Sequence, residues 1–280
     1  MTPEPLIETS KLTGATTASP AEMPETPVIV VDQLTARFGD NTIFDQVSFE
    51  VKRGEILVIL GGSGCGKSVL LKHMIGLYKP ANGQVLINGV DINTDDDRIL
   101  RQVRMDLGVL FQSGALFGSM TLAENVSLPI HEYTDLDLAT IELIVRMKLG
   151  LVSLAGYENH LPSEISGGMQ KRAGLARAMA LDPTILFFDE PSAGLDPITS
   201  VELDNLIKSI NAGMGTTMVI VTHELESIFN IAHRVIMLDK EARGIIAEGD
   251  PRELKDHSTD PRVLNFFNRR PAAGVAPEGA

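Results

Sequence analysis

The chain has no tryptophan, a single cysteine and no long apolar run among its 280 residues. Cys65 has no second thiol for a disulfide and no cysteine neighbours for a zinc site, which suits a reducing compartment and indicates a cytoplasmic protein. The longest uncharged stretch, residues 107–123, contains Gln112 and three glycines, whereas a membrane span needs about 20 mostly apolar residues. Residues 1–27 lack the basic and apolar regions of a secretory signal. We therefore expect any membrane role to come through a partner.

Basic residues are also scarce. The chain carries 24 Lys and Arg against 37 Asp and Glu, a formal net charge of −13 at pH 7. Proteins that bind nucleic acids usually present Lys and Arg that displace counterions from the phosphate backbone. The charge balance therefore argues against DNA or RNA as the principal partner.

The rest of the composition is that of a globular protein. With 44% hydrophobic residues the chain can bury a large core, and one domain with an inserted subdomain fits this length as well as two domains. The Pro, Thr, Ala and Glu content of residues 1–27 predicts a disordered N-terminal extension. Residues 271–280 are predicted to be a disordered, solvated tail, and residues 95–97, three aspartates, a solvated surface.

Several short segments read as strands. Residues 28–36 and 42–51 alternate in hydropathy around a turn at residues 39–41, which predicts a hairpin at a sheet edge. Residues 56–60 form a short, continuous apolar run, typical of a strand covered by helices on both faces. Two similar runs follow at residues 185–188 and 218–221.

Helical patterns alternate with these runs at residues 68–77, 199–212 and 225–232, which favours an α/β fold with a mainly parallel sheet. Strand signals fade between residues 114 and 181, where helical periodicity dominates. We interpret that span as a helical subdomain inserted into the α/β core.

A glycine-rich segment with lysine and serine at its end follows the first buried run and opens a helix. This is the setting in which a phosphate-binding loop is expected. Glycines let backbone N–H groups surround phosphate oxygens, Lys67 neutralises the β- and γ-phosphates, and Ser68 offers a hydroxyl to Mg²⁺. A flexible glycine turn is the alternative, but the four fixed positions coincide by chance in about one chain of this length in a hundred. The segment consists of Gly61, Gly62, Ser63, Gly64, Cys65, Gly66, Lys67 and Ser68.

Two acids, Asp189 and Glu190, end the apolar run 185–188. Ligands of open α/β sheets gather at the carboxyl ends of strands, so Asp189 suits the magnesium shell and Glu190 suits a base beside the attacking water. Two acids that merely end a strand in solvent are the alternative. A phosphate loop in the same sheet makes that alternative weaker.

A third segment, residues 164–170, leads into a helical pattern at residues 171–180, with Ser166 or a neighbour at the N-cap. A helix that opens with serine and two glycines can receive a phosphate. An ordinary capped helix explains these residues equally well, so on their own they leave both interpretations open.

Taken together and in this order, the motifs resemble those of the nucleotide-binding subunit of an ATP-binding-cassette (ABC) transporter, over residues 28–249. The resemblance implies a P-loop NTPase fold: an ABC ATPase core with a mainly parallel sheet, an antiparallel β subdomain and an inserted helical subdomain. It also implies an ABC ATPase domain at residues 28–270. Within it, residues 28–113 and 182–250 would form the core, residues 114–181 the helical subdomain and residues 251–270 a C-terminal tail.

The resemblance implies a role for each matching residue. ATP and Mg²⁺ would be the cofactors, with Glu190, His223 and Lys67 catalytic and Ser68, Gln112 and Asp189 around the metal. The remaining nucleotide contacts would come from the adenine-stacking aromatic, the phosphate loop and the residue after it, the signature motif and the D-loop: Phe38, Gly61 to Gly66, Val69, Ser166, Gly167, Gly168 and Asp196. A lone Phe or His is more often core or surface; six ordered matches weigh against that interpretation.

The sequence departs from the common pattern at a few positions. Met169 and Ile165 stand where the signature usually has Gln and Leu, and Val69 stands where Thr is frequent. None of these changes removes the serine hydroxyl or the glycine N–H groups, and the side chain of Val69 is not expected to reach the phosphates. The resemblance further implies a head-to-tail homodimer in which Ser166 and Gly168 of one copy close over the γ-phosphate of the other.

A narrower resemblance lies in residues 111–117, 124–126, 196–200 and 260–263. They look like the ATPases of bacterial phospholipid transporters that work with MCE-domain proteins. This resemblance implies permease subunits, a periplasmic MCE protein and sometimes a small STAS-domain partner. It also implies a peripheral position on the cytoplasmic face of the inner membrane. An importer of small polar solutes, a non-transport ABC ATPase and a catalytically silent scaffold are the alternatives. Glu190 and His223 argue against the last.

Overall fold

The computed structural model describes residues 27–270. The disorder expected for residues 1–27 and 271–280 concerns segments outside the described residues, except for Pro27, which begins the first strand.

The expected hairpin forms the edge of a small antiparallel sheet. Its strands are β1 (Pro27–Phe38) and β2 (Asn41–Lys52), with β2 on the outside and β1 between β2 and β4. Two strands that the sequence pattern did not predict, β4 (Asn82–Ile87) and β5 (Val90–Asp91), complete the sheet in the order β2-β1-β4-β5.

The second sheet confirms the mainly parallel prediction. Its order is β10-β9-β3-β8-β7-β6, in which every pairing is parallel except that of β9 with β10. The predicted strands are β3 (Ile56–Gly61), β7 (Ile185–Asp189) and β8 (Thr217–Val221). The unpredicted strands are β6 (Leu107–Leu110), β9 (Arg234–Asp239) and β10 (Gly244–Gly249).

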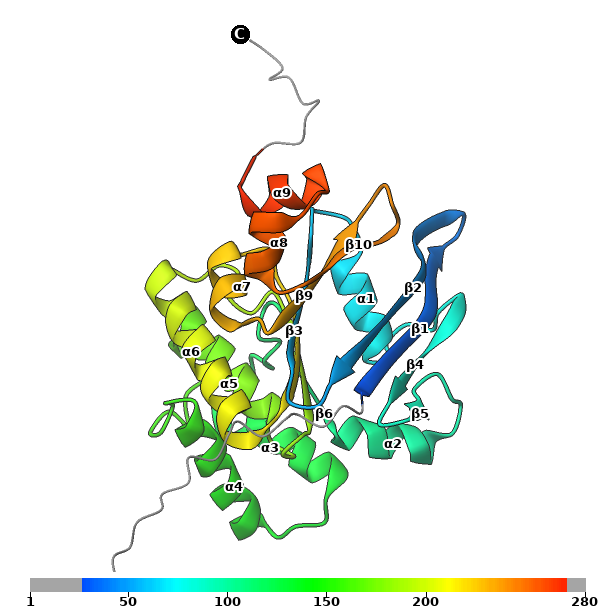
Figure 1. Ribbon diagram of the computed structural model, residues 1–280. Coiled ribbons are helices and arrows are strands. Elements are labelled where there is room, and N and C mark those ends of the chain that lie inside the picture. Colours follow the sequence, from blue (N-terminus) through cyan, green and yellow to red (C-terminus); the bar gives the residue numbers. More distant parts are fainter. Residues whose placement is uncertain (1–26, 271–280) are drawn as a thin grey trace, which may run out of the picture.

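Helices cover both faces of this sheet (Figure 1). The predicted helices are α1 (Lys67–Met74), α6 (Pro197–Met214) and α7 (Leu225–Ile231). The exposed aspartates at 95–97 gain a structural role, because Asp96 accepts a hydrogen bond from the Arg98 N–H and caps α2 (Asp97–Met105).

The inserted segment is helical, as predicted. It contains α3 (Leu122–Tyr133), α4 (Leu138–Leu151), a short 3₁₀ turn (Pro162–Glu164) and α5 (Gly167–Ala178). Thr121 and Glu124 cap α3 reciprocally, and Ser166 caps α5 by accepting from the Met169 N–H. Helix α5 also packs on β6, where a Cβ on Gly108 would lie 2.2 Å from the Ala178 carbonyl oxygen.

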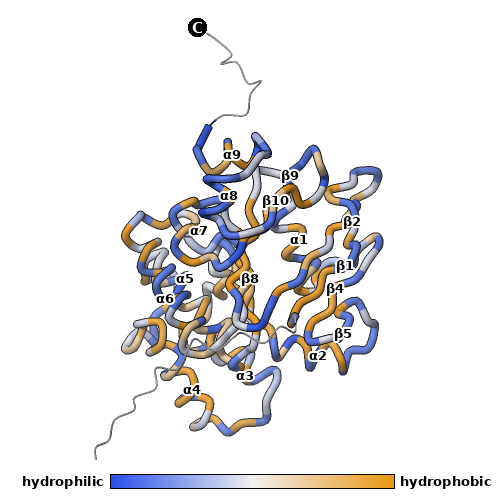
Figure 2. The backbone as a smooth tube through the Cα atoms, viewed as in Figure 1, coloured by the Kyte–Doolittle hydropathy of each residue, from blue (hydrophilic) through white to orange (hydrophobic). Residues whose placement is uncertain are grey.

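The large sheet separates two apolar cores. Alternate residues of β3 face opposite ways, so Val58 lies in the core with α3 to α7 while Leu57 and Ile59 lie in the core with α1 and the antiparallel sheet. In Figure 2 the central strand β8 of the large sheet is apolar, whereas β2 of the antiparallel sheet mixes apolar and polar residues. Because each face of β3 is covered by one of these cores, the strand carries an unbroken apolar run.

Residues 251–270 fold as two short helices, α8 (Pro251–His257) and α9 (Pro261–Phe267), at the end of the sheet where β3 leads into α1 (Figure 1). Val263 and Phe267 of α9 are buried in the core. Arg262 pairs with Asp239 at 2.8 Å and Asp260 at 2.7 Å. The C-terminal tail expected at these residues is therefore part of the packed structure.

A partly buried ion pair, in which Glu55 is buried and Arg234 half-buried, ties the two sheets together. The Arg234 guanidinium of β9 lies 2.6 Å from Glu55 Oε1, donates to the Glu50 carbonyl oxygen of β2 at 2.6 Å, and pairs with Glu248 of β10. Removing one partner of a buried pair leaves an uncompensated charge. We expect Arg234→Ala to lower the free energy of unfolding by about 2–4 kcal/mol.

Urea unfolding followed by circular dichroism measures this effect. Arg146→Ala is the matched control, because Arg146 pairs with Glu142 on the exposed face of α4 and such pairs contribute only about 0.3–0.5 kcal/mol. Equal destabilisation by the two variants would contradict the importance of the Arg234 network.

Candidate functional site

The glycine-rich loop bends tightly between β3 and α1. Gly61 has φ 148° and Gly66 has φ 100°. A Cβ on Gly61 would lie 2.3 Å from the Leu238 carbonyl oxygen, and one on Gly66 would lie 2.7 Å from Ile43. Neighbouring β-strands therefore enforce glycine at both positions. The Lys67 ammonium donates to the carbonyl oxygens of Gly61 at 2.9 Å and Gly62 at 3.2 Å, so the loop curls around a positive charge.

This loop forms one wall of a cavity of about 630 Å³. The cavity brings together most of the predicted site residues and adds Phe266 from α9. The residues that line it are Gly61, Gly62, Ser63, Gly64, Gly66, Lys67, Ser68, Val69, Gln112, Glu190, His223 and Phe266. The remaining loop residue, Cys65, is buried beneath it, and this burial raises the pKa of its thiol.

Two polar pairs stand at the carboxyl ends of β7 and β8. The Ser68 hydroxyl donates to Asp189 Oδ1 at 2.9 Å. His223 Nδ1 lies 2.9 Å and 3.0 Å from the two carboxylate oxygens of Glu190. Glu190 is 9% exposed, has φ 48°, and its backbone N–H donates to Val221 at 2.8 Å. Such a left-handed backbone is uncommon outside glycine and turns the Glu190 side chain toward His223 and the cavity.

Two cations of α5 that the sequence analysis missed hold the loop that contains Gln112. Lys171 is buried, donates to the Gln112 carbonyl oxygen, and lies 3.4 Å from that of Glu190. Burial lowers the pKa of its ammonium group, and Asp189 and Glu190 oppose that shift. Arg177 donates to the carbonyl oxygen of Ala115 at 2.8 Å. The only signal in the sequence was three basic residues, Lys171, Arg172 and Arg177, in a helix whose other buried residues are mostly small and apolar.

The signature segment and Asp196 do not line this cavity. Ser166 is exposed at the start of α5, and a Cβ on Gly168 would lie 2.5 Å from the Thr199 side chain. Close packing of α5 on α6 thus accounts for glycine at 168. Asp196 caps α6 by accepting from the N–H groups of Ile198 and Thr199, each at 3.1 Å.

Phe38 also lies outside the cavity lining, at the end of β1. Its ring is 48% exposed and packs edge-on against Tyr78 at 5.5 Å. Phe38 is thus an accessible aromatic side chain. It belongs to the β1–β2 hairpin, and this hairpin packs against the phosphate loop at Gly66.

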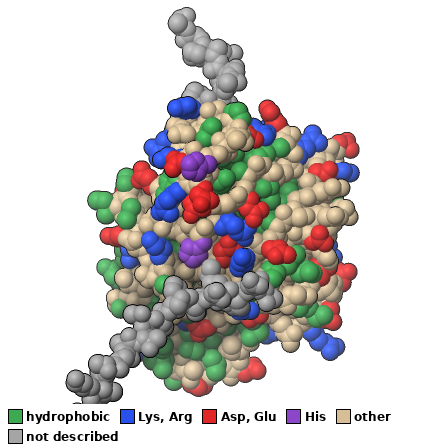
Figure 3. Space-filling model, viewed as in Figure 1, with side chains coloured by type: hydrophobic (Ala, Val, Ile, Leu, Met, Phe, Trp, Pro, Cys, Tyr) green, Lys and Arg blue, Asp and Glu red, His purple; other side chains and the backbone are tan. Residues whose placement is uncertain are grey.

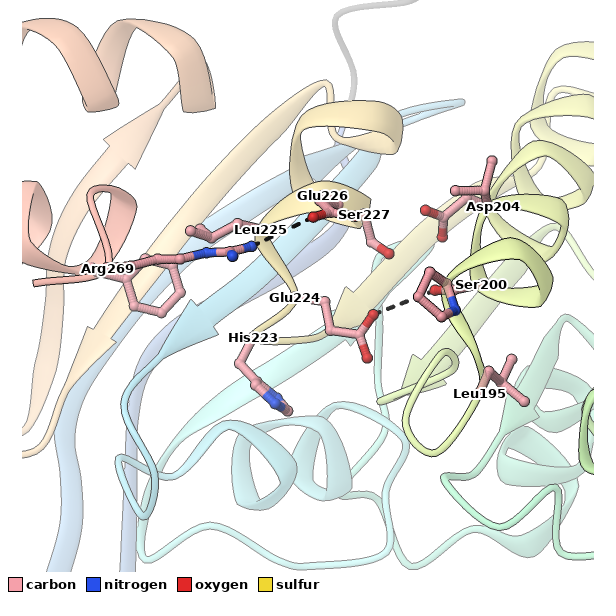
Figure 4. Close-up of a pocket in the computed structure, with 12 residues that line it drawn as sticks. Leu195, Ser200, Asp204, His223, Glu224, Leu225, Glu226, Ser227 and Arg269 are labelled. Atoms are coloured by element: carbon pink, nitrogen blue, oxygen red, sulfur yellow. Dashed lines mark hydrogen bonds and ion pairs between the residues drawn. The ribbon is translucent and has the colours of Figure 1, made fainter.

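A smaller cavity of about 400 Å³ adjoins the first and shares His223 and Phe266 with it. Figure 4 shows Glu224 hydrogen-bonded to Ser200 of α6, and Arg269 reaching Glu226 of α7. The segment after His223 is thereby held between α6 and the C-terminal residues.

The arrangement is that of a P-loop ATPase: a phosphate loop with its lysine, a hydroxyl–carboxylate pair, and a second carboxylate beside a histidine. A model of the ABC transporter family matches residues 44–193. The chain belongs to this family, as an ATP-binding subunit that hydrolyses ATP. This confirms the family and the fold class that the motifs indicated.

Curated relatives agree on the family and differ in what they transport. The chain is 45% identical over 248 residues to the probable ribonucleotide transport ATP-binding protein mkl of Mycobacterium leprae, covering 89% of this chain and 71% of that protein. It is 43% identical over 241 residues to the intermembrane phospholipid transport system ATP-binding protein MlaF of Haemophilus influenzae, covering 86% and 90%.

Solved structures share the fold. The ATP-binding cassette MJ0796, in a dimeric post-hydrolysis state bound to ADP and Pi, superposes with a TM-score of 0.72 at 30% identity, covering 79% of this chain and 98% of that one. Another is cbiO1 from Clostridium perfringens, part of the cbiONQ transporter complex, with a TM-score of 0.75 at 27% identity, covering 88% and 96%.

Two further properties concern the helices and the surface of the described residues. Between residues 27 and 270, no helix combines the length and the apolar character needed to cross a bilayer. On the face drawn in Figure 3, basic and acidic side chains of the described residues are interspersed.

Proposed function

We propose that this chain binds MgATP in the cavity beside the phosphate loop, with Glu190 as the general base. The observation that carries the proposal is the meeting of the Ser68–Asp189 and Glu190–His223 pairs at the cavity that Lys67 also lines. The loop N–H groups and Lys67 bind the phosphates. Glu190 accepts a proton from the attacking water, and His223, within hydrogen-bond distance, orients that carboxylate and reaches toward the γ-phosphate.

The residues around Ser68 fit a magnesium ion. An alcohol and a carboxylate oxygen 2.9 Å apart are hard oxygen donors, and Mg²⁺ in nucleotide sites is held by one or two carboxylates with phosphates and waters. Among residues 27–270 there is no group of three or more His, Cys, Asp and Glu placed to hold a metal. Ser68, Asp189 and Gln112 would hold the ion. When bound, it neutralises charge on the β- and γ-phosphates.

The active unit proposed is a head-to-tail homodimer. Ser166 and Asp196 are exposed and do not line the cavity of their own chain. This supports the proposal that they contribute to the cavity of a second copy. The dimeric state of the cassette MJ0796 supports the same assembly. Ser166 and Gly168 would contact the γ-phosphate across the interface, and loss of that phosphate would let the dimer open and move attached permease subunits.

The load proposed is phospholipid or a similarly apolar molecule. The motifs at residues 113–117 and 196–200 and the likeness to MlaF support it. Removing a lipid from a bilayer exposes acyl chains to water at about 0.8 kcal/mol per CH₂, so the transfer needs an energy source and a protected route. The partners proposed are two permease subunits and a periplasmic MCE-domain protein, with a small STAS-domain protein in some systems of this kind. The chain would sit on the cytoplasmic face of the inner membrane.

The likeness to mkl makes ribonucleotide the competing load, and one experiment separates the two. The chain is purified with its native membrane partners, bound small molecules are extracted and identified by mass spectrometry, and transfer of labelled lipid between vesicles is measured with and without ATP. We expect co-purifying phospholipid and ATP-dependent transfer. A receptor loaded with a nucleotide, sugar, amino acid or metal, together with no lipid transfer, would reject the lipid assignment and leave the ATPase intact.

A further inference from the structure

Four aromatic rings join the β1–β2 hairpin to helix α1 in series. Phe38 meets Tyr78 at 5.5 Å and 77°, Tyr78 meets His73 at 5.7 Å and 73°, and His73 meets Phe44 at 5.7 Å and 70°. All three contacts are edge-to-face, an arrangement that aromatic pairs favour. Phe38 and Phe44 belong to the hairpin, whereas His73 and Tyr78 belong to α1 and the turn after it.

The inner half of the series is fixed in the core. Phe44 is fully buried and His73 is 2% exposed. His73 Nδ1 lies 2.8 Å from the Val69 carbonyl oxygen, and burial lowers the pKa of the ring, so the neutral form is favoured. A Cβ on Gly66 would lie 3.2 Å from the Phe44 ring. Phe44 therefore packs directly on the phosphate loop at Gly66, and His73 packs on Phe44.

Tyr78 is held by the way α1 ends. Gly76 has φ 72°, and the N–H groups of Leu77 and Tyr78 both donate to the Lys72 carbonyl oxygen, at 2.9 Å and 3.2 Å. Hydrogen bonds of this kind close the C-terminal turn of a helix, and they need the left-handed backbone that glycine adopts easily. The Lys72 ammonium lies 5.5 Å from the centre of the Tyr78 ring, within cation–π range. Tyr78 thus has a defined position although it is 36% exposed.

Phe38, in contrast, is the last residue of its strand and 48% exposed. Exposed side chains exchange rotamers on the picosecond to nanosecond scale, and ordering one on binding costs free energy. A base stacked on Phe38 while its phosphates lie on the loop needs the ring in one orientation. We propose that Tyr78 is a positioning residue for ATP binding, which holds the Phe38 ring in a fixed orientation relative to the phosphate loop. This inference rests on the proposed role of Phe38 as the adenine platform.

The test compares binding of ATP with binding of inorganic tripolyphosphate, which has no base. We expect Tyr78→Ala to raise the Kd for ATP by about three- to tenfold, the range expected for loss of an aromatic pair. The Kd for tripolyphosphate and kcat at saturating ATP should not change. Tyr78→Phe should restore wild-type affinity, because the ring makes the contact. Leu77→Ala is the matched control, since Leu77 is the exposed neighbour and belongs to none of the ring contacts.

A double-mutant cycle with Phe38→Ala then separates the possible outcomes, with thermal melting run on every variant. Support requires that Phe38→Ala weakens ATP binding and that adding Tyr78→Ala weakens it no further. If Phe38→Ala weakens binding and Tyr78→Ala alone does not, the inference is wrong and the adenine platform stands. The inference is also wrong if Tyr78→Ala raises the Kd for ATP equally in the presence and in the absence of the Phe38 ring. It is wrong as well if Tyr78→Ala raises the Kd for tripolyphosphate. No effect of Phe38→Ala would reject the platform itself, and the inference with it.

Discussion

Glu190→Gln should slow ATP turnover by roughly 10²–10⁴-fold, the contribution typical of a positioned general base, while the Kd for ATP stays near that of the wild type. The amide has the size of the carboxylate but cannot accept the proton of the attacking water. The phosphate loop, Lys67 and the Ser68–Asp189 pair are left in place. The variant should therefore bind ATP and accumulate as an ATP-bound dimer.

The measurement is ATPase rate, equilibrium ATP binding and size-exclusion chromatography on one purified sample. Glu224→Gln is the matched control, because Glu224 follows His223 in the chain but lines the adjoining cavity, where it accepts from the Ser200 hydroxyl at 3.4 Å. The control should turn over within a few-fold of the wild type. A similar rate for Glu190→Gln would remove Glu190 from the role of base.

The sequence predicted those helices and strands whose burial or capping is visible in their own residues. Strands β3, β7 and β8 are buried along their whole length, so each leaves an unbroken apolar run. Helix α6 begins at an Asp–Pro cap and ends at Gly215, with φ 65°. Both signals can be read without knowledge of any neighbour.

The missed strands depend on partners that are distant in the chain. β6 has four residues, one of them Gly108, and merges into a long uncharged stretch. Glycine there is explained only by the backbone of α5 lying against it. β10 shows no fully buried residue, so its pairing with β9 leaves little trace in hydropathy.

The candidate site likewise contains residues that local motifs predict and residues that only tertiary contacts reveal. Motifs located the loop 61–68, Asp189, Glu190 and His223. The fold gathers them around one cavity, except for Cys65, which is buried beneath the loop, and Asp189, which contacts Ser68 at the cavity wall. Lys171 and Phe266 escaped notice because their roles come from tertiary contact. Lys171 is a buried cation whose partners are carbonyl oxygens of Gln112 and Glu190, and backbone acceptors have no sequence signature.

The homodimer proposal predicts that two inactive variants restore each other. Ser166→Arg should block hydrolysis by placing a long cation where the γ-phosphate of the other copy lies, and Lys67→Ala should block it by removing the phosphate contact. Suppose that each site takes Lys67 from one chain and Ser166 from its partner. A mixed dimer then has one site with both lesions and one site with none. If each site were built within one chain, both sites of the mixed dimer would be damaged.

We therefore expect each variant alone to be inactive, and an equal mixture to recover up to about a quarter of the wild-type ATPase rate, because half of the dimers are mixed and each holds one intact site. Lys67→Ala mixed with wild type calibrates how fast a single intact site works, since such a mixed dimer has one intact site under either geometry. The calibration is the rate that remains after subtracting the contribution of wild-type homodimers, which are about a quarter of the dimers in an equal mixture. Recovery close to that calibration supports sites shared across the interface. If the calibration shows that a dimer with one intact site is active, a mixture of the two variants as inactive as its components would show that Ser166 does not complete the partner's site.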